Sequence, residues 1–199
     1  LYAKDLPADV VDEIWRRYVG AIMPIADAGK LGAIHFQFPP WFTAGSASFR
    51  YLEEVRERLP RFTVAVEFRN LTSFTDAAAA KQMLDFLRRH RFVHVMVDEP
   101  EGSKTAIPQV WEATSDERAI LRLHGRNVAT WNAKGLDAAS DRFNWDYSET
   151  ELSGFVSPAE DIARQVKVMD AIFNNNYEDQ GQRNARTLMR LLGSHAVEP

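Results

Sequence analysis

Charged side chains of the types that carry out acid/base chemistry stand at the ends of short apolar segments of this sequence. Glu67 and Asp98 each close such a segment, and a carboxylate there suits general acid/base catalysis or metal binding. His124 follows another segment and suits the role of general base or ligand. We therefore assign Glu67, Asp98 and His124 as the candidate catalytic residues.

A second set of polar and aromatic residues lies near these three in the same strand-end positions. The candidate substrate-binding residues are Gln37, Arg69, Arg122, Arg126, Trp131, Asn174 and Asn175. A guanidinium group binds phosphate or carboxylate with two parallel hydrogen bonds, so the arginines indicate an anionic small molecule. Each residue also has a structural interpretation: the carboxylates would hold arginines, Trp131 would cap the site, and the asparagines would order a loop.

The sequence does not identify a cofactor. Glu67, Asp98, His124 and Asn174 together offer oxygen and nitrogen ligands, but no H-E-x-x-H or related spacing supports a metal, so we assign no metal site. The absence of cysteine excludes thiolate catalysis and Cys-based zinc or iron–sulfur centres.

Bulk properties narrow the function classes further. A length of 199 residues predicts one domain, residues 1–199. The net charge of −4 does not support nucleic-acid binding, although a local basic cleft stays open. No apolar run approaches the roughly 20 residues that span a bilayer, and we expect a cytoplasmic protein without a membrane partner. Nothing indicates the oligomeric state.

Helical and strand patterns alternate along the chain and must position these side chains. Apolar spacing predicts helices at 7–28, 48–59, 76–90, 148–165 and 182–192, and strands at 31–38, 62–68, 92–97, 119–123 and 166–173. Gly154 and Pro158 predict that the fourth helix is broken into two pieces. Segments 98–116 and 127–147 are expected to be long loops. Strict alternation predicts parallel strands with helical crossovers.

The alternation within each strand favours a TIM-type (β/α) barrel over a doubly wound sheet. One face of every strand is apolar, and the other becomes polar toward its carboxyl end, as in a barrel whose interior opens at a mouth. We assign Glu67, Asp98 and His124 to this interior face, with His35 and His94 deeper inside as packed core residues. Five strands do not close an eight-stranded barrel, so we expect about three amino-terminal βα units to be absent.

Six short motifs occur in order over nearly the whole chain, and together they resemble the YecE-like family of uncharacterised proteins. They are Lys30-Leu31-Gly32, Phe36-Gln37-Phe38-Pro39-Pro40, Val66-Glu67-Phe68-Arg69, Asp98-Glu99-Pro100, Arg122-Leu123-His124-Gly125-Arg126 and Phe173-Asn174-Asn175. The resemblance implies a TIM-barrel-type fold and places most of the candidate residues at motif positions. It implies no reaction, substrate or cofactor. His35 stands where the family usually has an aliphatic residue, which implies that His35 is not essential.

Three functional hypotheses follow from these residues. The first is a hydrolase that acts on a phosphate- or carboxylate-bearing substrate by acid/base or metal-assisted chemistry. The second is a non-catalytic module that binds a nucleotide or nucleic acid through the arginines and Trp131. The third is a structural ion-pair network without a ligand.

Overall fold

Strands and helices alternate in the computed structural model, which describes residues 5–102 and 105–197. The five strands are β1 (Ile34–Gln37), β2 (Val64–Glu67), β3 (Phe92–Asp98), β4 (Arg118–Leu123) and β5 (Val168–Phe173). The helices are α1 (Ala8–Asp27), α2 (Ser46–Arg58), α3 (Ala77–Arg89), α4 (Val128–Trp131), α5 (Glu149–Ala163) and α6 (Gln180–Leu192), with short 3-10 helices at Leu71–Ser73, Ala139–Phe143 and Gly193–His195. The five strands and the five longer helices therefore confirm the sequence prediction. The segment 127–147, which was expected to be a loop, contains α4 and the 3-10 helix Ala139–Phe143. No helix in the described ranges has both the length and the apolar character needed to cross a membrane.

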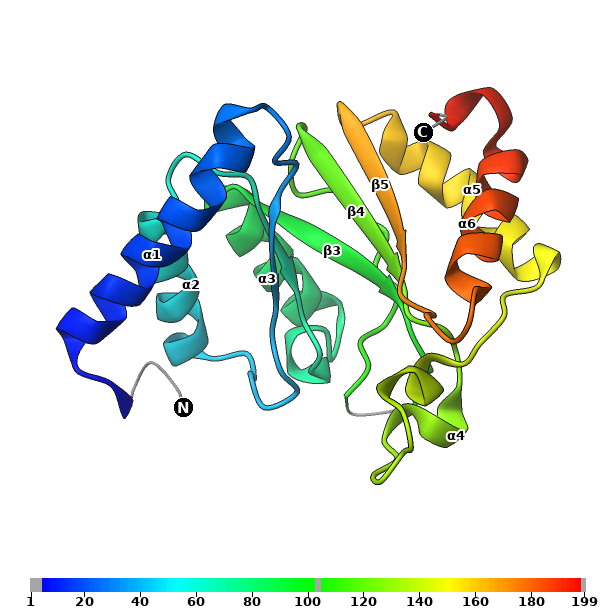
Figure 1. Cartoon of the computed structure of the whole chain (residues 1–199), viewed down its shortest axis with the longest axis horizontal. Helices are drawn as coiled ribbons and strands as arrows, with labels where there is room; N and C mark the ends of the chain where they lie inside the picture. The colour runs from blue at the N-terminus through cyan, green and yellow to red at the C-terminus, as the bar shows by residue number, and fades with distance from the viewer. Residues whose placement is uncertain (1–4, 103–104, 198–199) are drawn as a thin grey trace.

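All strand pairs are parallel, and the sheet has the order β1-β2-β3-β4-β5. The carboxyl ends of the strands lie on the side of the molecule where α4 is found (Figure 1). The described strands form an open, curled sheet, so a closed barrel is not observed. β3 pairs with β2 through Phe92, Val93 and His94 and with β4 through its second half, from Val95 to Asp98.

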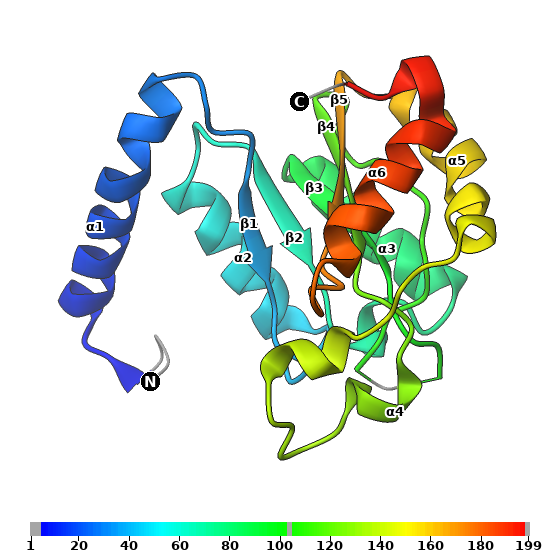
Figure 2. The same cartoon turned by 45° about the vertical axis from the view of Figure 1, so that its right-hand side comes forward.

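Two hydrophobic clusters support the two halves of the sheet. The first joins β1, β2 and β3 to α2 and α3, with Leu52, Val55 and Leu87 fully buried. The second joins Met96 and β4 to α5 and α6. In both views α1 lies at one end of the molecule and the α5–α6 pair at the other (Figures 1 and 2). Each half of the sheet is thus packed against helices through its own hydrophobic cluster.

The prediction that the fourth long helix is broken into two pieces is wrong, because α5 runs unbroken through Pro158. Its buried residues are Leu152, Phe155, Ala159 and Ile162, spaced at three and four positions, so burial of one continuous face offsets the lost backbone hydrogen bond. The proline ring would crowd the carbonyl four residues earlier, which belongs to Gly154. Ser148 and Glu151 form a capping box at the helix start.

The register of β3 corrects the face assigned to this strand. Val95 pairs with Ile120 and Val97 with Arg122, so the odd-numbered residues of β3 share the face of Glu67 and Arg122. Asp98 pairs with Leu123 and lies on the opposite face, together with His94. All seven residues of β3 are buried, and both faces are largely apolar, so alternation carried no signal in this strand.

His94 is a buried core histidine, as predicted, but on the helix-facing side, with its ring centroid 5.6 Å from that of Phe74. Neither ring nitrogen has a hydrogen-bond partner within the described residues. Burial and, to a smaller extent, the charge of Arg88 lower the pKa of His94 from 6.5 to about 4, against an opposing effect of the Val110 backbone.

Replacing His94 with methionine should remove a pH dependence of folding stability. Because the folded-state pKa is depressed, the unfolded chain takes up a proton first as the pH falls below 6.5, and the native state loses about 2 kcal/mol by pH 5. His94→Met cannot take up this proton, so urea unfolding at pH 7.5 and pH 5 should show a smaller loss for the variant. An equal loss in both proteins would contradict the assignment.

Candidate active site

The carboxylate of Glu67 is the centre of the polar cluster at the carboxyl ends of the strands. Its side chain has no exposed surface. Oε2 accepts a hydrogen bond of 2.7 Å from Arg122 Nη1 and lies 3.1 Å from His35 Nε2, while Oε1 lies 3.1 Å from His124 Nε2. Three cationic or imidazole groups, one from β1 and two from the end of β4, therefore meet one buried carboxylate.

Strand register brings these groups together. Gln37 pairs with Glu67, and His35 pairs with Ala65, so these four residues of β1 and β2 point to one face. Arg122 reaches the same face from β4 and donates a 2.6 Å hydrogen bond from Nη1 to Gln37 Oε1. The cluster therefore depends on the curl of the sheet, because β1 and β4 are separated by two strands.

Asn174 fixes the protonation of His124. Its Oδ1 accepts a 2.8 Å hydrogen bond from Arg122 Nη2, which leaves the Nδ2 amide group facing His124 Nδ1 at 3.1 Å. His124 Nδ1 must then be the acceptor, and Nε2–H donates to Glu67. Burial lowers the pKa of His124 against the effect of Glu67, in agreement with a neutral imidazole. Both ring nitrogens of His124 are thus occupied.

The electrostatics of Glu67 favour its ionised form. Burial alone would raise the pKa of Glu67, but hydrogen bonds from His124 and His35 and the charge of Arg122 together lower it well below its usual value of 4.5. The site therefore contains a carboxylate that stays charged at neutral pH without contact with water.

Glu99 is a site residue that the sequence analysis did not single out. It follows Asp98, and the register of β3 directs it to the inner face. Oε1 accepts a 2.8 Å hydrogen bond from Ile107 N, and Oε2 lies 3.3 Å from Arg69 Nε. Burial raises the pKa of Glu99 to about 7, partly offset by Arg69. Its place in the motif Asp98-Glu99-Pro100, directly after β3, was a sequence signal that could have identified it.

Arg69 lies between the two carboxyl groups and covers Trp131. Its Nη1 is 3.9 Å from Glu67 Oε1, and its guanidinium carbon is 4.6 Å from the centre of the Trp131 ring. Trp131 is buried and meets the His124 ring edge-on at 5.9 Å. The side chains of Arg69 and Trp131 therefore close one side of the cluster.

Three predicted site residues lie elsewhere. Asp98 accepts hydrogen bonds from Arg126, at 2.7 to 3.1 Å, and from the Tyr147 hydroxyl at 2.6 Å, on the opposite face of β3. Asn175 is buried and donates to Trp145 O and Asn184 Oδ1. The expectation that Asp98 adjoins Glu67 is wrong, because the face of β3 was assigned incorrectly. Asp98, Arg126 and Asn175 instead hold the segment before α5 against the sheet.

His35 also differs from its prediction as a packed core residue. Its side chain is 26% exposed, and its Nε2 contacts Glu67, whereas Nδ1 has no partner among the described residues. It lies on the edge strand β1, where the inner face is open. The usual aliphatic residue at this position gave no reason to expect a polar contact.

In the described ranges, no group of three or more His, Asp or Glu side chains is placed to hold a metal ion.

Comparison with known proteins places the chain in one family. The family model described as "Protein of unknown function DUF72" matches residues 3–199, and YecE-like is another name for the same family. The UPF0759 protein YunF of Bacillus subtilis (strain 168) is 27% identical over 190 residues, which cover 94% of this chain and 67% of YunF.

Solved structures of the same family share the fold. A DUF72 family protein from Enterococcus faecalis V583 superposes with a TM-score of 0.86 at 26% identity, covering 94% of this chain and 67% of that one. A DUF72 family protein from Thermotoga maritima MSB8 gives a TM-score of 0.81 at 31% identity, with 90% and 65% covered. The chain therefore spans about two thirds of the length of these relatives.

Gly125 separates the two polar networks. It follows His124, which points to Glu67, and precedes Arg126, which binds Asp98 on the other face. Its φ angle is +87°, and a Cβ atom would lie 2.6 Å from Cβ of Trp145. A glycine is therefore required for the turn to pass Trp145.

Gly125→Ala should destabilise the protein by more than the 1–2 kcal/mol typical of a left-handed conformation, because Trp145 must also move. Gly135→Ala is the matched control: its φ angle is +73°, but no atom lies within 4 Å of the new Cβ. Urea unfolding of both variants would measure the difference. Equal losses of stability would show that the contact with Trp145 has no cost.

Glu99→Gln should make the protein more stable than the wild type at alkaline pH. Because the folded-state pKa is raised from 4.5 to about 7, the native state keeps its proton while the unfolded chain loses it, and stability falls by up to about 3 kcal/mol as the pH rises from 4.5 through 7. Glutamine imitates the protonated carboxyl and avoids this loss. Unfolding curves at pH 5 and pH 8 would test it; a variant that loses stability in parallel with the wild type would refute the buried, protonated state.

Proposed function

The chain belongs to the DUF72 family of proteins of unknown function, and from the geometry around Glu67 we propose that it is a hydrolase that acts on an anionic small molecule by acid/base catalysis. The observation that carries this proposal is the pair formed by Glu67 and His35. A buried, ionised carboxylate holds one nitrogen of an imidazole whose other nitrogen has no partner in the described residues. This arrangement orients an imidazole for proton transfer.

In this proposal His35 is the general base. Its Nδ1 takes a proton from a water molecule, the resulting hydroxide attacks the phosphorus or carbonyl carbon of the substrate, and the imidazolium returns the proton to the leaving group. Glu67 stabilises the imidazolium through Nε2–H. His124 and Asn174 act as positioning residues, because His124 has no free nitrogen. In relatives with an aliphatic residue at position 35, Glu67 would have to act without this imidazole.

Arg122 supports the choice of an anionic substrate. A guanidinium group has five N–H donors, and Arg122 uses three of them for Gln37, Glu67 and Asn174. The remaining donors, on Nε and Nη2, have no partner in the described part of the chain. They can hold an oxygen of a phosphate or carboxylate beside His35.

The alternative of a nucleotide- or nucleic-acid-binding module gains no support from Trp131. The indole ring is only 3% exposed and lies below Arg69, so it offers no open face on which a base could stack.

We also propose that the sheet forms part of a TIM-type barrel in the complete fold. Val168 and Ile172 on the inner face of β5 are about 40% exposed in the open sheet, and the packed interior of a closed barrel would bury these apolar residues.

His35→Gln and Glu67→Gln should each lower kcat/KM for hydrolysis by 10²- to 10⁴-fold, the usual contribution of a general base. We would screen the full chain against p-nitrophenyl phosphate, bis-p-nitrophenyl phosphate and p-nitrophenyl acetate, then assay the variants on the best substrate. His90→Gln is the control, because His90 Nε2 lies 3.7 Å from Glu53 at the surface, and its activity should stay within twofold of the wild type.

The stability of the same variants separates catalysis from a structural network. Glu67→Gln leaves Arg122 without its buried partner and should cost about 3 kcal/mol. His35→Gln should keep its unfolding midpoint because its ring is partly exposed. Loss of stability without loss of activity would favour the structural network. Loss of activity only in Glu67→Gln would overturn the role of His35 and make Glu67 itself the base.

A further inference from the structure

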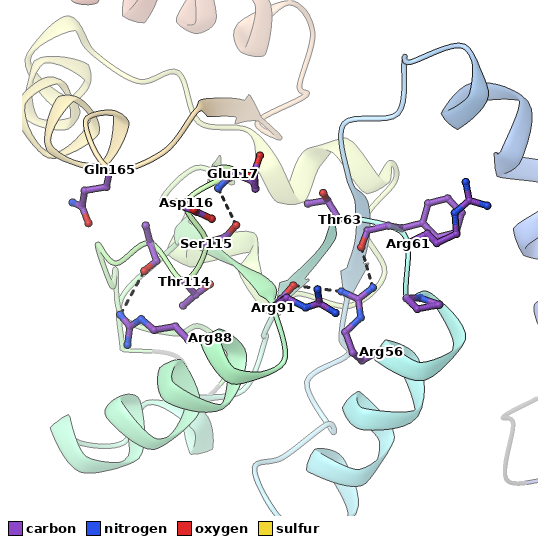
Figure 3. A pocket seen from close by; sticks show the side chains of 13 residues that line it. Arg56, Arg61, Thr63, Arg88, Arg91, Thr114, Ser115, Asp116, Glu117 and Gln165 are labelled. Atoms are coloured by element: carbon purple, nitrogen blue, oxygen red, sulfur yellow. Dashed lines mark hydrogen bonds between the residues drawn. The ribbon is translucent and has the colours of Figure 1, made fainter.

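A cavity of about 600 Å³ lies at the amino ends of β2, β3 and β4, away from the Glu67 cluster (Figure 3). Its walls come from the turn between α2 and β2, the turn between α3 and β3, and the segment 113–117 before β4. Because the strands are parallel, this cavity and the Glu67 cluster lie at opposite ends of the sheet. A ligand bound here would not contact the proposed reaction site.

The lining of this cavity is positively charged in a protein of net charge −4. Four arginines face two carboxylates there: Arg56, Arg61, Arg88 and Arg91 against Asp116 and Glu117. One of the carboxylates is already neutralised, since Lys167 Nζ lies 2.6 Å from Glu117 Oε1. The local excess of positive charge therefore opposes the overall charge of the molecule.

Arg56 is a fixed positive charge without a carboxylate partner. Its guanidinium group donates to the backbone carbonyls of Leu59, Phe62 and Arg91, the last two at 2.9 and 3.4 Å. Its Nε is buried and has no hydrogen-bond partner within the described residues. Burial and the charge of Arg91 lower the pKa of Arg56, which shows that the two cations repel each other. An anion placed between them would remove this repulsion.

Arg61 and Arg91 supply further guanidinium donors in the lining of the cavity. Both are exposed, and neither forms an ion pair in the described part of the chain. Arg91 has a φ angle of +55°, which is uncommon for a residue with a side chain. Arg88 differs from them because Asp85 and Glu112 neutralise it. The charge available to a ligand therefore comes from Arg56, Arg61 and Arg91.

We propose that this cavity is a second binding site, for a small molecule that carries a pyrophosphate or a comparable multiply charged phosphate group. Three guanidinium groups without carboxylate partners match a ligand of two or more negative charges better than a single carboxylate. The cavity volume is large enough for a small organic phosphate. This proposal does not depend on the proposed hydrolase activity. The ligand would bind at the amino ends of the strands, at the opposite end of the sheet from Glu67.

Isothermal titration calorimetry of the full chain with inorganic pyrophosphate tests this site. The double variant Arg61→Gln/Arg91→Gln should bind pyrophosphate at least tenfold more weakly than the wild type. It removes two of the three guanidinium groups that have no carboxylate partner. Arg89→Gln is the matched control: Arg89 is an exposed arginine near the end of α3 that does not line the cavity, and its affinity should stay within twofold.

Two results would overturn the proposal. One is the absence of measurable heat from the wild type with up to 10 mM pyrophosphate. The other is an equal loss of affinity in Arg89→Gln and in the double variant, which would show only non-specific charge attraction. Thermal unfolding of each variant without ligand confirms that it is folded. Arg56 is left unchanged because it also binds the carbonyls at the end of α2.

Discussion

The carboxylate of Glu67 is negatively charged although it is buried, and hydrogen-bond donors from neighbouring strands stabilise that charge. Removing a carboxylate from water costs several kcal/mol, so such a charge persists only if donors surround it. His35 comes from β1, Arg122 from β4 and His124 from the residue after β4, and Asn174 after β5 orients the last two. A flat sheet would keep β1 and β4 apart. The curl of the sheet and the ionisation of Glu67 therefore depend on each other.

The contrast with Glu99 shows that donors, and not burial, decide the charge. Both side chains are fully buried, and both lie near Arg69. Glu67 receives hydrogen bonds from two imidazoles and a guanidinium group, which lower its pKa, whereas Glu99 receives one backbone hydrogen bond and its pKa rises to about 7. Neighbouring carboxyl groups with opposite shifts are typical of sites that both donate and accept protons.

The sequence predicted the parallel strands, and most of the Glu67 cluster, because alternation is clear in strands with one polar face. It failed in β3, where Val93, Val95 and Val97 on one face and Met96 on the other are all buried. Asp98, which was predicted at the site, therefore lies on the opposite face, and Glu99, which was not predicted, lies near Glu67 and Arg69. His35 was misplaced because periodicity does not show that its ring reaches the carboxylate of Glu67. The break predicted at Pro158 was wrong because local helix propensity takes no account of the stabilisation from the buried face of α5.

The arginines at the two ends of the sheet have different partners, and this difference distinguishes the proposed reaction site from the proposed anion-binding cavity. At the carboxyl ends, Arg122 already binds the carboxylate of Glu67, so its position is fixed before any substrate arrives. At the amino ends, Arg56 donates to backbone carbonyls, and Arg56, Arg61 and Arg91 form no ion pair among the described residues. Asp116 and Glu117 line the same cavity, so the arginines there are in excess over the carboxylates. The sheet can therefore respond to an anion at one end without rearrangement of the charges that hold Glu67 at the other.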